Sequence, residues 1–213
     1  MNQGRILIVE DDPFLQMTLA QTLESAKFEI TAHVGSAAEA IQSAKINQPE
    51  IAVLDLDLGP GANGIDLAIA LRSLHPRIGL ILLTSYSDPR LSDPHAPQLP
   101  KGTIFLTKSH VTNLQILTTA ILQVKLWPLE VKRKSSLERS HLTQNQIEVL
   151  ILLAEGLTTA EIATRQGISE KGVEGTISRL QSILGISKDK KFNPRIQLVR
   201  AYYALSGKKT PGA

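Results

Sequence analysis

The chain has 213 residues, of which 42% are hydrophobic and 20% charged, and its mean hydropathy is close to zero. This composition is typical of a folded globular protein rather than a disordered or fibrous one, and the length favours two small domains over one core. Cysteine is absent, which excludes disulfides, thiolate metal sites and cysteine nucleophiles. No apolar run approaches the roughly 18 residues of a membrane span, so we expect a cytoplasmic protein that does not bind membranes.

Charge is distributed unevenly along the chain. Residues 1–125 hold 9 basic and 12 acidic side chains, a net charge of −3, whereas residues 126–213 hold 14 and 8, a net charge of +6. A basic half joined to an acidic half indicates that the second half binds a polyanion. DNA fits better than a membrane surface because the sequence contains no strongly apolar basic helix.

Short apolar runs with the character of β-strands alternate with helical stretches in the first half. The predicted strands are Arg5–Val9, Phe28–His33, Ile51–Leu54, Ile78–Leu83 and Thr103–Leu106. One helix is predicted to begin at Pro13, with Asp12 as its N-cap, and further helices are predicted over Ala37–Lys45, Gly64–Leu74 and His110–Val124. Five such units predict an α/β domain with a doubly wound, five-stranded parallel sheet covered by helices on both faces.

The connection between the fourth and fifth predicted strands is unusual. It contains prolines at positions 89, 94, 97 and 100. Proline removes a backbone donor and disfavours a helical conformation in the residue before it. We therefore expect one short turn plus loop here, in place of a regular helix.

The second half has a different pattern. Trp127-Pro128 ends the last helix of the first half, and residues 126–140 are predicted to be a linker that leads into a helical domain over residues 141–213. Two capping boxes, Thr143-Gln-Asn-Gln146 and Thr158-Thr-Ala-Glu161, precede short helices. The third predicted helix, Glu170–Leu184, is amphipathic, with Val173, Ile177, Leu180 and Leu184 on its apolar face. Two helices, a tight turn and an amphipathic third helix are typical of a helix-turn-helix domain.

Charged and hydroxyl side chains follow the predicted strands of the first half. Glu10 and Asp11 follow the first strand, Asp55 the third, Thr84 the fourth and Lys108 the fifth. The carboxyl ends of parallel strands meet at one edge of the sheet, where ligands bind. Crowded carboxylates there would be stabilised by a hard cation such as Mg²⁺, and a carboxylate beside the metal can attack a phosphoryl group.

These residues stand in motifs that resemble a known family. Residues 5–125 resemble a response-regulator receiver domain, which implies a flavodoxin-like fold. The matching stretches are Ile6-Leu-Ile-Val-Glu-Asp-Asp-Pro13, Pro49-Glu-Ile-Ala-Val-Leu-Asp55, Asn63-Gly-Ile-Asp-Leu67, Leu82-Leu-Thr84-Ser and Ile104-Phe-Leu-Thr-Lys108. The sequence departs from the family at the longer Gly59-Pro60-Gly61-Ala62 loop and at Ser109, where the family usually has proline.

The resemblance implies that Asp55 is the phosphoacceptor. It also implies an Mg²⁺ site formed by Asp11 and Asp55 directly, Glu10 through water and Asp57 through its backbone carbonyl. By the same resemblance, Thr84 and Lys108 would bind the phosphoryl group, and the ring of Phe105 would act as the aromatic switch. For Phe105, a place in the hydrophobic core is nearly as well supported.

Residues 141–186 resemble the LuxR/NarL-type output domain. The resemblance rests on Leu142-Thr143, Glu148-Val-Leu-Ile-Leu-Leu-Ala-Glu-Gly-Leu157, Glu161-Ile-Ala163, Ile168-Ser169-Glu170 and Leu184-Gly185-Ile186. It implies that the third helix enters the major groove of DNA. The candidate DNA-binding residues are Lys171, Glu174, Gly175, Ser178 and Arg179. Glu174 stands where many members of the family have lysine, which predicts fewer contacts than usual.

Together, the two resemblances imply a two-component response regulator. A sensor histidine kinase would phosphorylate Asp55, and the change would modulate dimerisation and binding to promoter DNA, with a homodimer at least when activated. The receiver would catalyse only its own phosphotransfer and dephosphorylation. Two alternatives stay open: a haloacid-dehalogenase-like phosphotransferase, suggested by the motif Asp55-Leu-Asp57, and a regulator that binds protein or RNA rather than DNA.

Overall fold

The computed structural model describes residues 3–59, 61–94, 97–111, 113–130, 142–186 and 193–207. The chain divides into two compact units: Met1–Thr84 with Pro97–Leu137, and Ser85–Ala96 with Glu138–Ala213. Residues 131–140, which form most of the predicted linker, lie outside the described residues. The second unit is therefore discontinuous in sequence, because it includes part of the proline-rich connection.

The first unit contains the predicted parallel sheet. Its strands are β1 (Arg5–Val9), β2 (Glu29–Val34), β3 (Ile51–Leu54), β4 (Gly79–Thr84) and β5 (Ile104–Thr107), in the order β2-β1-β3-β4-β5. All neighbouring strands are parallel, which confirms the predicted α/β class. The first and third strands have the predicted bounds, and the other three start and end one residue later than predicted.

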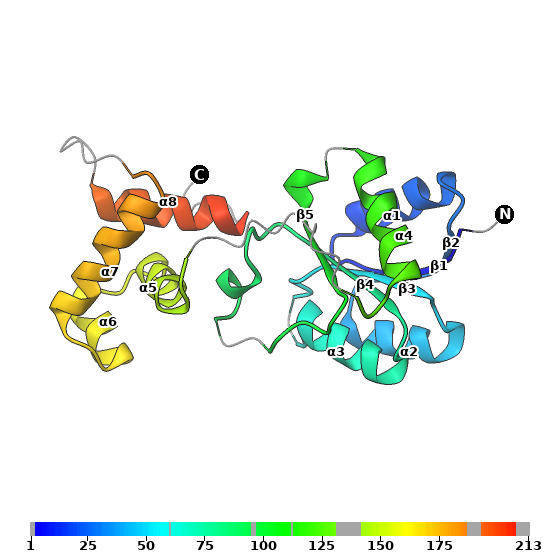
Figure 1. The fold of residues 1–213 in the computed structure, drawn as a ribbon, viewed down its shortest axis with the longest axis horizontal. Coiled ribbons are helices and arrows are strands. Elements are labelled where there is room, and N and C mark those ends of the chain that lie inside the picture. The colour runs from blue at the N-terminus through cyan, green and yellow to red at the C-terminus, as the bar shows by residue number, and fades with distance from the viewer. Residues whose placement is uncertain are drawn as a thin grey trace. The chain divides into compact units, whose positions relative to one another are not determined.

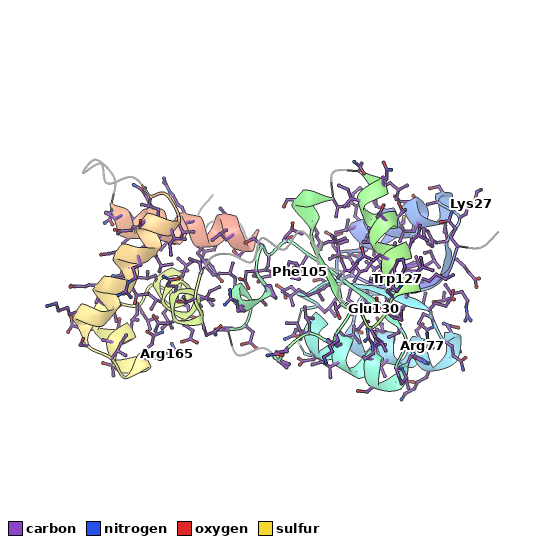
Figure 2. All side chains as sticks on the ribbon, in the orientation of Figure 1. Lys27, Arg77, Phe105, Trp127, Glu130 and Arg165 are labelled. Atoms are coloured by element: carbon purple, nitrogen blue, oxygen red, sulfur yellow. The ribbon has the colours of Figure 1, made fainter. Side chains whose placement is uncertain are left out.

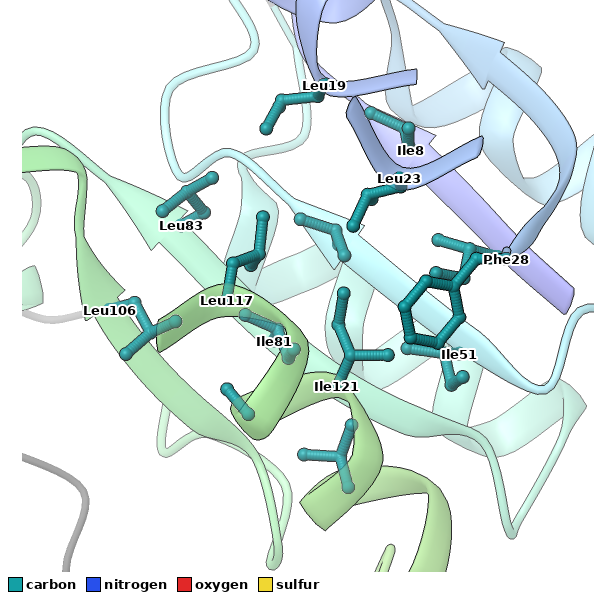
Figure 3. Close-up of a cluster of buried hydrophobic side chains, with 14 of the residues drawn as sticks. Ile8, Leu19, Leu23, Phe28, Ile51, Ile81, Leu83, Leu106, Leu117 and Ile121 are labelled. Carbon is teal, nitrogen blue, oxygen red and sulfur yellow. The ribbon is translucent and has the colours of Figure 1, made fainter. Parts of the chain in front are cut away.

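Helices cover both faces of this sheet (Figure 1). Helices α1 (Pro13–Ser25) and α4 (Leu114–Leu126) lie on one face, and α2 (Ala37–Asn47) and α3 (Gly64–Leu74) lie on the other. Asp12, Ser36 and Asn63 cap the first three helices through their side-chain oxygens. Figure 3 shows how α1 and α4 bury their apolar side chains against the strands, with Leu23 and Ile121 near the centre of the cluster.

The last helix of the first unit starts later than predicted. The sequence pattern predicts it from His110, but Lys108–His110 forms a 3-10 turn, η2, and α4 begins at Leu114. Asn113 is the residue that sets this start, because its side chain accepts a hydrogen bond from the backbone N–H of Ile116. The short turn keeps the backbone after Lys108 close to the carboxyl edge of the sheet.

The proline-rich connection is confirmed as a turn plus loop over residues 85–94. It contains a 3-10 turn, η1 (Pro89–Leu91), capped by Asp88, and no α-helix occurs in its described part. Pro89 occupies the first position of this turn, where its missing N–H costs nothing.

The second unit is helical apart from this connection. It contains α5 (Gln144–Ala154), α6 (Thr159–Gln166), α7 (Glu170–Ile183) and α8 (Pro194–Ser206). Both predicted capping boxes are present, and Gly167 ends α6 in the left-handed conformation, with φ of 65°. None of the helices described for the chain is long and apolar enough to cross a membrane.

Candidate functional site: an acidic pocket and an exposed helix

The carboxylates of the predicted pocket meet because of the strand register. Val9 pairs with Leu54, so Glu10 and Asp55 follow at the same level of two neighbouring strands. The backbone N–H of Asp55 donates to the carbonyl of Val9 over 2.8 Å, which fixes this alignment. Oxygen atoms of Glu10, Asp11 and Asp55 all lie within 4.8 Å of one another. Three carboxylates at this spacing fit Mg²⁺, which prefers oxygen ligands and uses few protein side chains.

Lys108 is the cation of the pocket. Its Nζ lies 2.8 Å from Oδ2 of Asp55 and 2.9 Å from Oε2 of Glu10. Both carboxylates are nearly buried, since only 2% of Glu10 and 7% of Asp55 is exposed, whereas Asp11 is open to solvent. A lysine that bridges two buried carboxylates compensates charges that would otherwise be costly to remove from water.

Burial changes the acidity of these groups. It raises the pKa of Glu10 to about 7, although the hydrogen bond from Lys108 works in the opposite direction, and the charge of Asp55 raises the value further. Burial also raises the pKa of Asp55, again against the influence of Lys108. Burial opposes the charge on Lys108, but its hydrogen bonds with Asp55 and Glu10 outweigh this effect and raise its pKa. Lys108 is therefore fully charged at neutral pH, while Glu10 is poised to exchange a proton.

A glycine holds the loop after Asp55 in place. A Cβ atom added to Gly64 would lie 2.0 Å from the carbonyl oxygen of Asp55, which is far closer than two such atoms can approach. This close approach lets the N–H of Gly64 donate to the carbonyl of Leu56 over 2.9 Å, while the N–H of Leu56 donates to Oδ1 of Asp55 over 2.7 Å. Gly64 belongs to the Asn63–Leu67 motif, but the motif does not by itself indicate this close approach to Asp55.

A second set of contacts holds the backbone of Glu10 in place, and these contacts were not predicted from the sequence. Nε2 of Gln16 donates to the backbone carbonyl of Glu10 over 3.0 Å, and Oε1 of Gln16 lies 2.9 Å from Nδ1 of His33. Gln16 lies on α1 and His33 on β2, so two elements hold the backbone of the acidic loop. No sequence pattern indicates these contacts, because they join α1 to the loop after β1 and to β2.

The remaining predicted residues of the pocket have different environments. Thr84 is buried at the end of β4, opposite Thr107 on β5. Phe105 is buried within β5 (Figure 2), so its ring is part of the core in this structure. The side chain of Asp57 is exposed and does not join the three clustered carboxylates, in keeping with an expected contribution through its backbone.

The third helix of the second unit exposes most of the predicted DNA-binding residues. Lys171, Glu174, Ser178 and Arg179 are exposed on α7, and Gly175 has open space where a Cβ would lie. On the opposite side, Val173 and Leu180 are fully buried as predicted. Ile177 is only half-buried, and Thr176 is buried instead, because its hydroxyl lies within hydrogen-bonding distance of Oδ1 of Asn145 and the carbonyl of Gly172.

Comparison with known proteins matches both units to described families. Residues 6–94 match the response regulator receiver domain, and residues 140–191 match the bacterial regulatory proteins of the luxR family. The chain is a response regulator with a LuxR-family output domain. The receiver match ends before β5, so the assignment of Lys108 rests on its geometry and on its motif.

Two relatives match this chain over most of their length. The chain is 29% identical over 200 residues to the DNA-binding transcriptional activator DevR/DosR of Mycobacterium tuberculosis, covering 86% of this chain and 89% of the relative. It is 27% identical over 197 residues to the transcriptional activator protein ExaE of Pseudomonas putida, covering 85% and 90%.

The fold of this regulator also resembles solved structures. RcsB of Salmonella typhimurium superimposes with a TM-score of 0.56 at 22% identity, covering 97% of this chain and 100% of that one. RcsB in a complex with DNA gives a TM-score of 0.59 at 22% identity, covering 96% and 99%. At these identities the likeness establishes the fold.

Proposed function

We propose that a sensor histidine kinase phosphorylates this regulator on Asp55 and that the modification changes its dimerisation and its binding to promoter DNA. The observation that carries the proposal is the Asp55–Lys108 ion pair at the carboxyl edge of the sheet, beside Glu10 and Asp11. A cytoplasmic location accords with this role.

The residues of the pocket support a simple transfer. A carboxylate oxygen of Asp55 attacks phosphorus, the bond from phosphorus to the donor nitrogen breaks, and an acyl phosphate forms on Asp55. Lys108 is placed to follow the developing charge from the carboxylate to a phosphoryl oxygen, and Thr84 offers a hydroxyl for another. Glu10, Asp11, Asp55 and the carbonyl of Asp57 would hold Mg²⁺, which supplies charge neutralisation when bound. We propose no other enzymatic activity.

The pKa of Glu10 leads to a prediction for metal binding. Mg²⁺ needs ionised carboxylates, so below about pH 7 a proton competes with the metal and the apparent Kd rises by up to roughly tenfold per pH unit. Above that pH, the affinity for Mg²⁺ should no longer change with pH. Calorimetric titration with MgCl₂ across the range from about pH 5.5 to 8.5 measures this dependence. Glu10→Gln should remove most of it, and an equal dependence in that variant would assign the proton to another group.

The exposed face of α7 supports binding of this regulator to duplex DNA. RcsB has been solved in complexes with DNA, and one of them contains two RcsB dimers on two parallel DNAs. For this chain, selection of bound sequences from a random duplex pool, with and without acetyl phosphate, tests the proposal. Binding to duplex DNA should weaken steeply with salt. If the protein does not bind duplex DNA but does bind RNA or another protein, the alternative of a regulator that acts on protein or RNA is favoured.

Glu174 should determine specificity on this face. A carboxylate in the major groove accepts a hydrogen bond from the amino group of cytosine, whereas lysine adds a general attraction to phosphates. Glu174→Lys should strengthen non-specific binding, steepen the salt dependence by about one unit and reduce discrimination at one C·G pair by roughly 1–3 kcal/mol. Titration of selected and scrambled duplexes at several salt concentrations measures these effects.

Arg179→Ala is the matched comparison on the same face. It should weaken binding to all duplexes alike, as the loss of a phosphate contact does. If Glu174→Lys leaves binding unchanged, α7 does not lie in the groove, and an adaptor role for the second unit becomes the better explanation.

A further inference from the structure

Residues 85–94, here called the docking segment, follow directly after Thr84 and form part of the second unit. In sequence they belong to the connection between β4 and β5 of the receiver. Leu91 is only 1% exposed, and η1 contacts both α5 and α8. A segment that buries an aliphatic side chain in the helical unit is part of that unit's core rather than a loop over its surface.

Hydrogen bonds hold the docking segment at both of its ends. The backbone N–H of Ser87 donates to the carbonyl of Leu205, in the last turn of α8, over 2.8 Å. At the other end, Nη2 of Arg90 donates to the carbonyl of Leu142 over 3.1 Å, and Nε2 of Gln144 donates to the carbonyl of Pro94 over 2.6 Å. The segment is thus tied to the end of α8 and to the start of α5.

The arginine at the centre of these contacts is itself positioned by a buried acid. Asp88 is 2% exposed, and its carboxylate accepts from Nε of Arg90 over 3.0 Å and from Nη2 over 2.7 Å. Charge-assisted contacts of this two-pronged kind fix orientation as well as distance. Gly207 adds a tight steric fit, because a Cβ there would lie 2.5 Å from Cβ of Ser85.

We propose that the docking segment transmits phosphorylation of the receiver to the DNA-binding unit. This inference rests on the proposed function, in which Thr84 binds the phosphoryl group. Only Ser85 and Tyr86 lie between Thr84 and Ser87, whose backbone amide is hydrogen-bonded to Leu205 of α8. Through so short a stretch of chain, a displacement of Thr84 acts directly on Ser85 and Ser87, which contact Gly207 and α8. By linkage, those contacts and phosphorylation then influence each other.

The test uses the full-length protein, with acetyl phosphate as donor and a selected duplex as ligand. In the wild type, phosphorylation should change the Kd for DNA by roughly 5- to 150-fold, the usual range of coupling between sites. Arg90→Ala should be labelled to the same extent, but the ratio of its Kd values with and without acetyl phosphate should approach one. Arg165→Ala is the matched control, since this exposed arginine of α6 lies 3.6 Å from Glu155, away from the segment (Figure 2), and it should retain the wild-type ratio.

A second variant guards against unfolding. Arg90→Ala removes the cation beside the buried Asp88, which is destabilising, whereas Asp88→Ala combined with Arg90→Ala removes both charges. Hydrogen exchange at the Ser87 amide reports docking directly and should change when the wild type is phosphorylated. The inference is wrong if the wild type is labelled but the protection of the Ser87 amide stays constant. It is also wrong if the double variant keeps the wild-type ratio of Kd values, because the docking segment then does not transmit phosphorylation. If the wild type takes up no phosphate, the proposed function fails, and this inference fails with it.

Discussion

Asp55→Asn is expected to abolish phosphorylation of the regulator. With Mg²⁺ and a small phosphodonor, mass spectrometry of the wild type should show one added phosphate, and the variant should show none, because an amide cannot form the acyl phosphate. Asp11→Ala should greatly reduce the label, since it removes a carboxylate from the group whose oxygens lie within 4.8 Å of one another. Label that persists in Asp55→Asn would defeat the assignment.

Lys108→Ala separates metal binding from transfer in the same pocket. The change removes a positive charge that lies 2.8 Å from Asp55, so the affinity for Mg²⁺ should be retained or improved. The rate of labelling should nevertheless fall by roughly 10²–10³-fold, as it does when a donor to developing charge is lost.

Asp57→Asn is the matched control for the phosphoacceptor. Its side chain is exposed and lies outside the carboxylate cluster, so labelling should continue at close to the wild-type level. In a haloacid-dehalogenase-like enzyme the signature includes both acids, and loss of either should stop turnover of phosphoesters. Normal labelling of Asp57→Asn therefore also decides against that alternative.

Gly64→Ala should disrupt the pocket without touching any charged group. The new methyl would collide with the carbonyl of Asp55 at 2.0 Å, and backbone cannot move aside as a flexible side chain can. We expect the free energy of unfolding to fall by about 1–3 kcal/mol, the usual cost of overpacking. Labelling of Asp55 should fall as well, because relief of the clash moves the loop that holds Leu56. Urea unfolding followed by the fluorescence of Trp127, the single tryptophan and a residue of the first unit, measures the change.

Gly35→Ala is the matched comparison in the same unit. A Cβ at Gly35 would lie 3.9 Å from the carbonyl of Glu10, an ordinary contact. Its unfolding free energy should stay within about 0.5 kcal/mol of the wild type, and its labelling should be normal. Equal losses in both variants would show that any added methyl near this edge is harmful, and that the close approach of Gly64 is not special.

Sequence was sufficient for most of the sheet because β1, β3, β4 and β5 are almost wholly buried, whereas β2 is half-buried or exposed along its length. Ile51–Leu54 forms a continuous apolar run bounded by Pro49-Glu50 and Asp55, and its short length and flanking residues favour a buried strand over a helix. The same runs placed Glu10 and Asp55 at strand ends, so the meeting of these acids follows from parallel pairing alone. Three strands shifted by one residue, and the start of α4 shifted by four residues, from His110 to Leu114, because Asn113 caps the helix.

The docking segment could not be predicted, and the reason is physical. The prolines predict a turn, but the local sequence does not indicate which helices the turn packs against. The contact of Arg90 with Leu142 spans 52 residues and that of Gln144 with Pro94 spans 50, so they depend on long-range packing. The contact between Gln16 and His33 could not be predicted for a similar reason, since it joins a helix to a neighbouring strand.

The discontinuity of the second unit has a consequence for biosynthesis. During translation, the chain from β4 to β5 leaves the ribosome before α5 and α8 exist, and domains generally fold in the order in which they emerge. β5 can therefore pair with the sheet before the helices that bury Leu91 have been synthesised. An output fragment that starts after residue 140 would never receive this side chain. Grafting such a fragment onto another receiver would transfer the helices of the unit without the piece that completes their core.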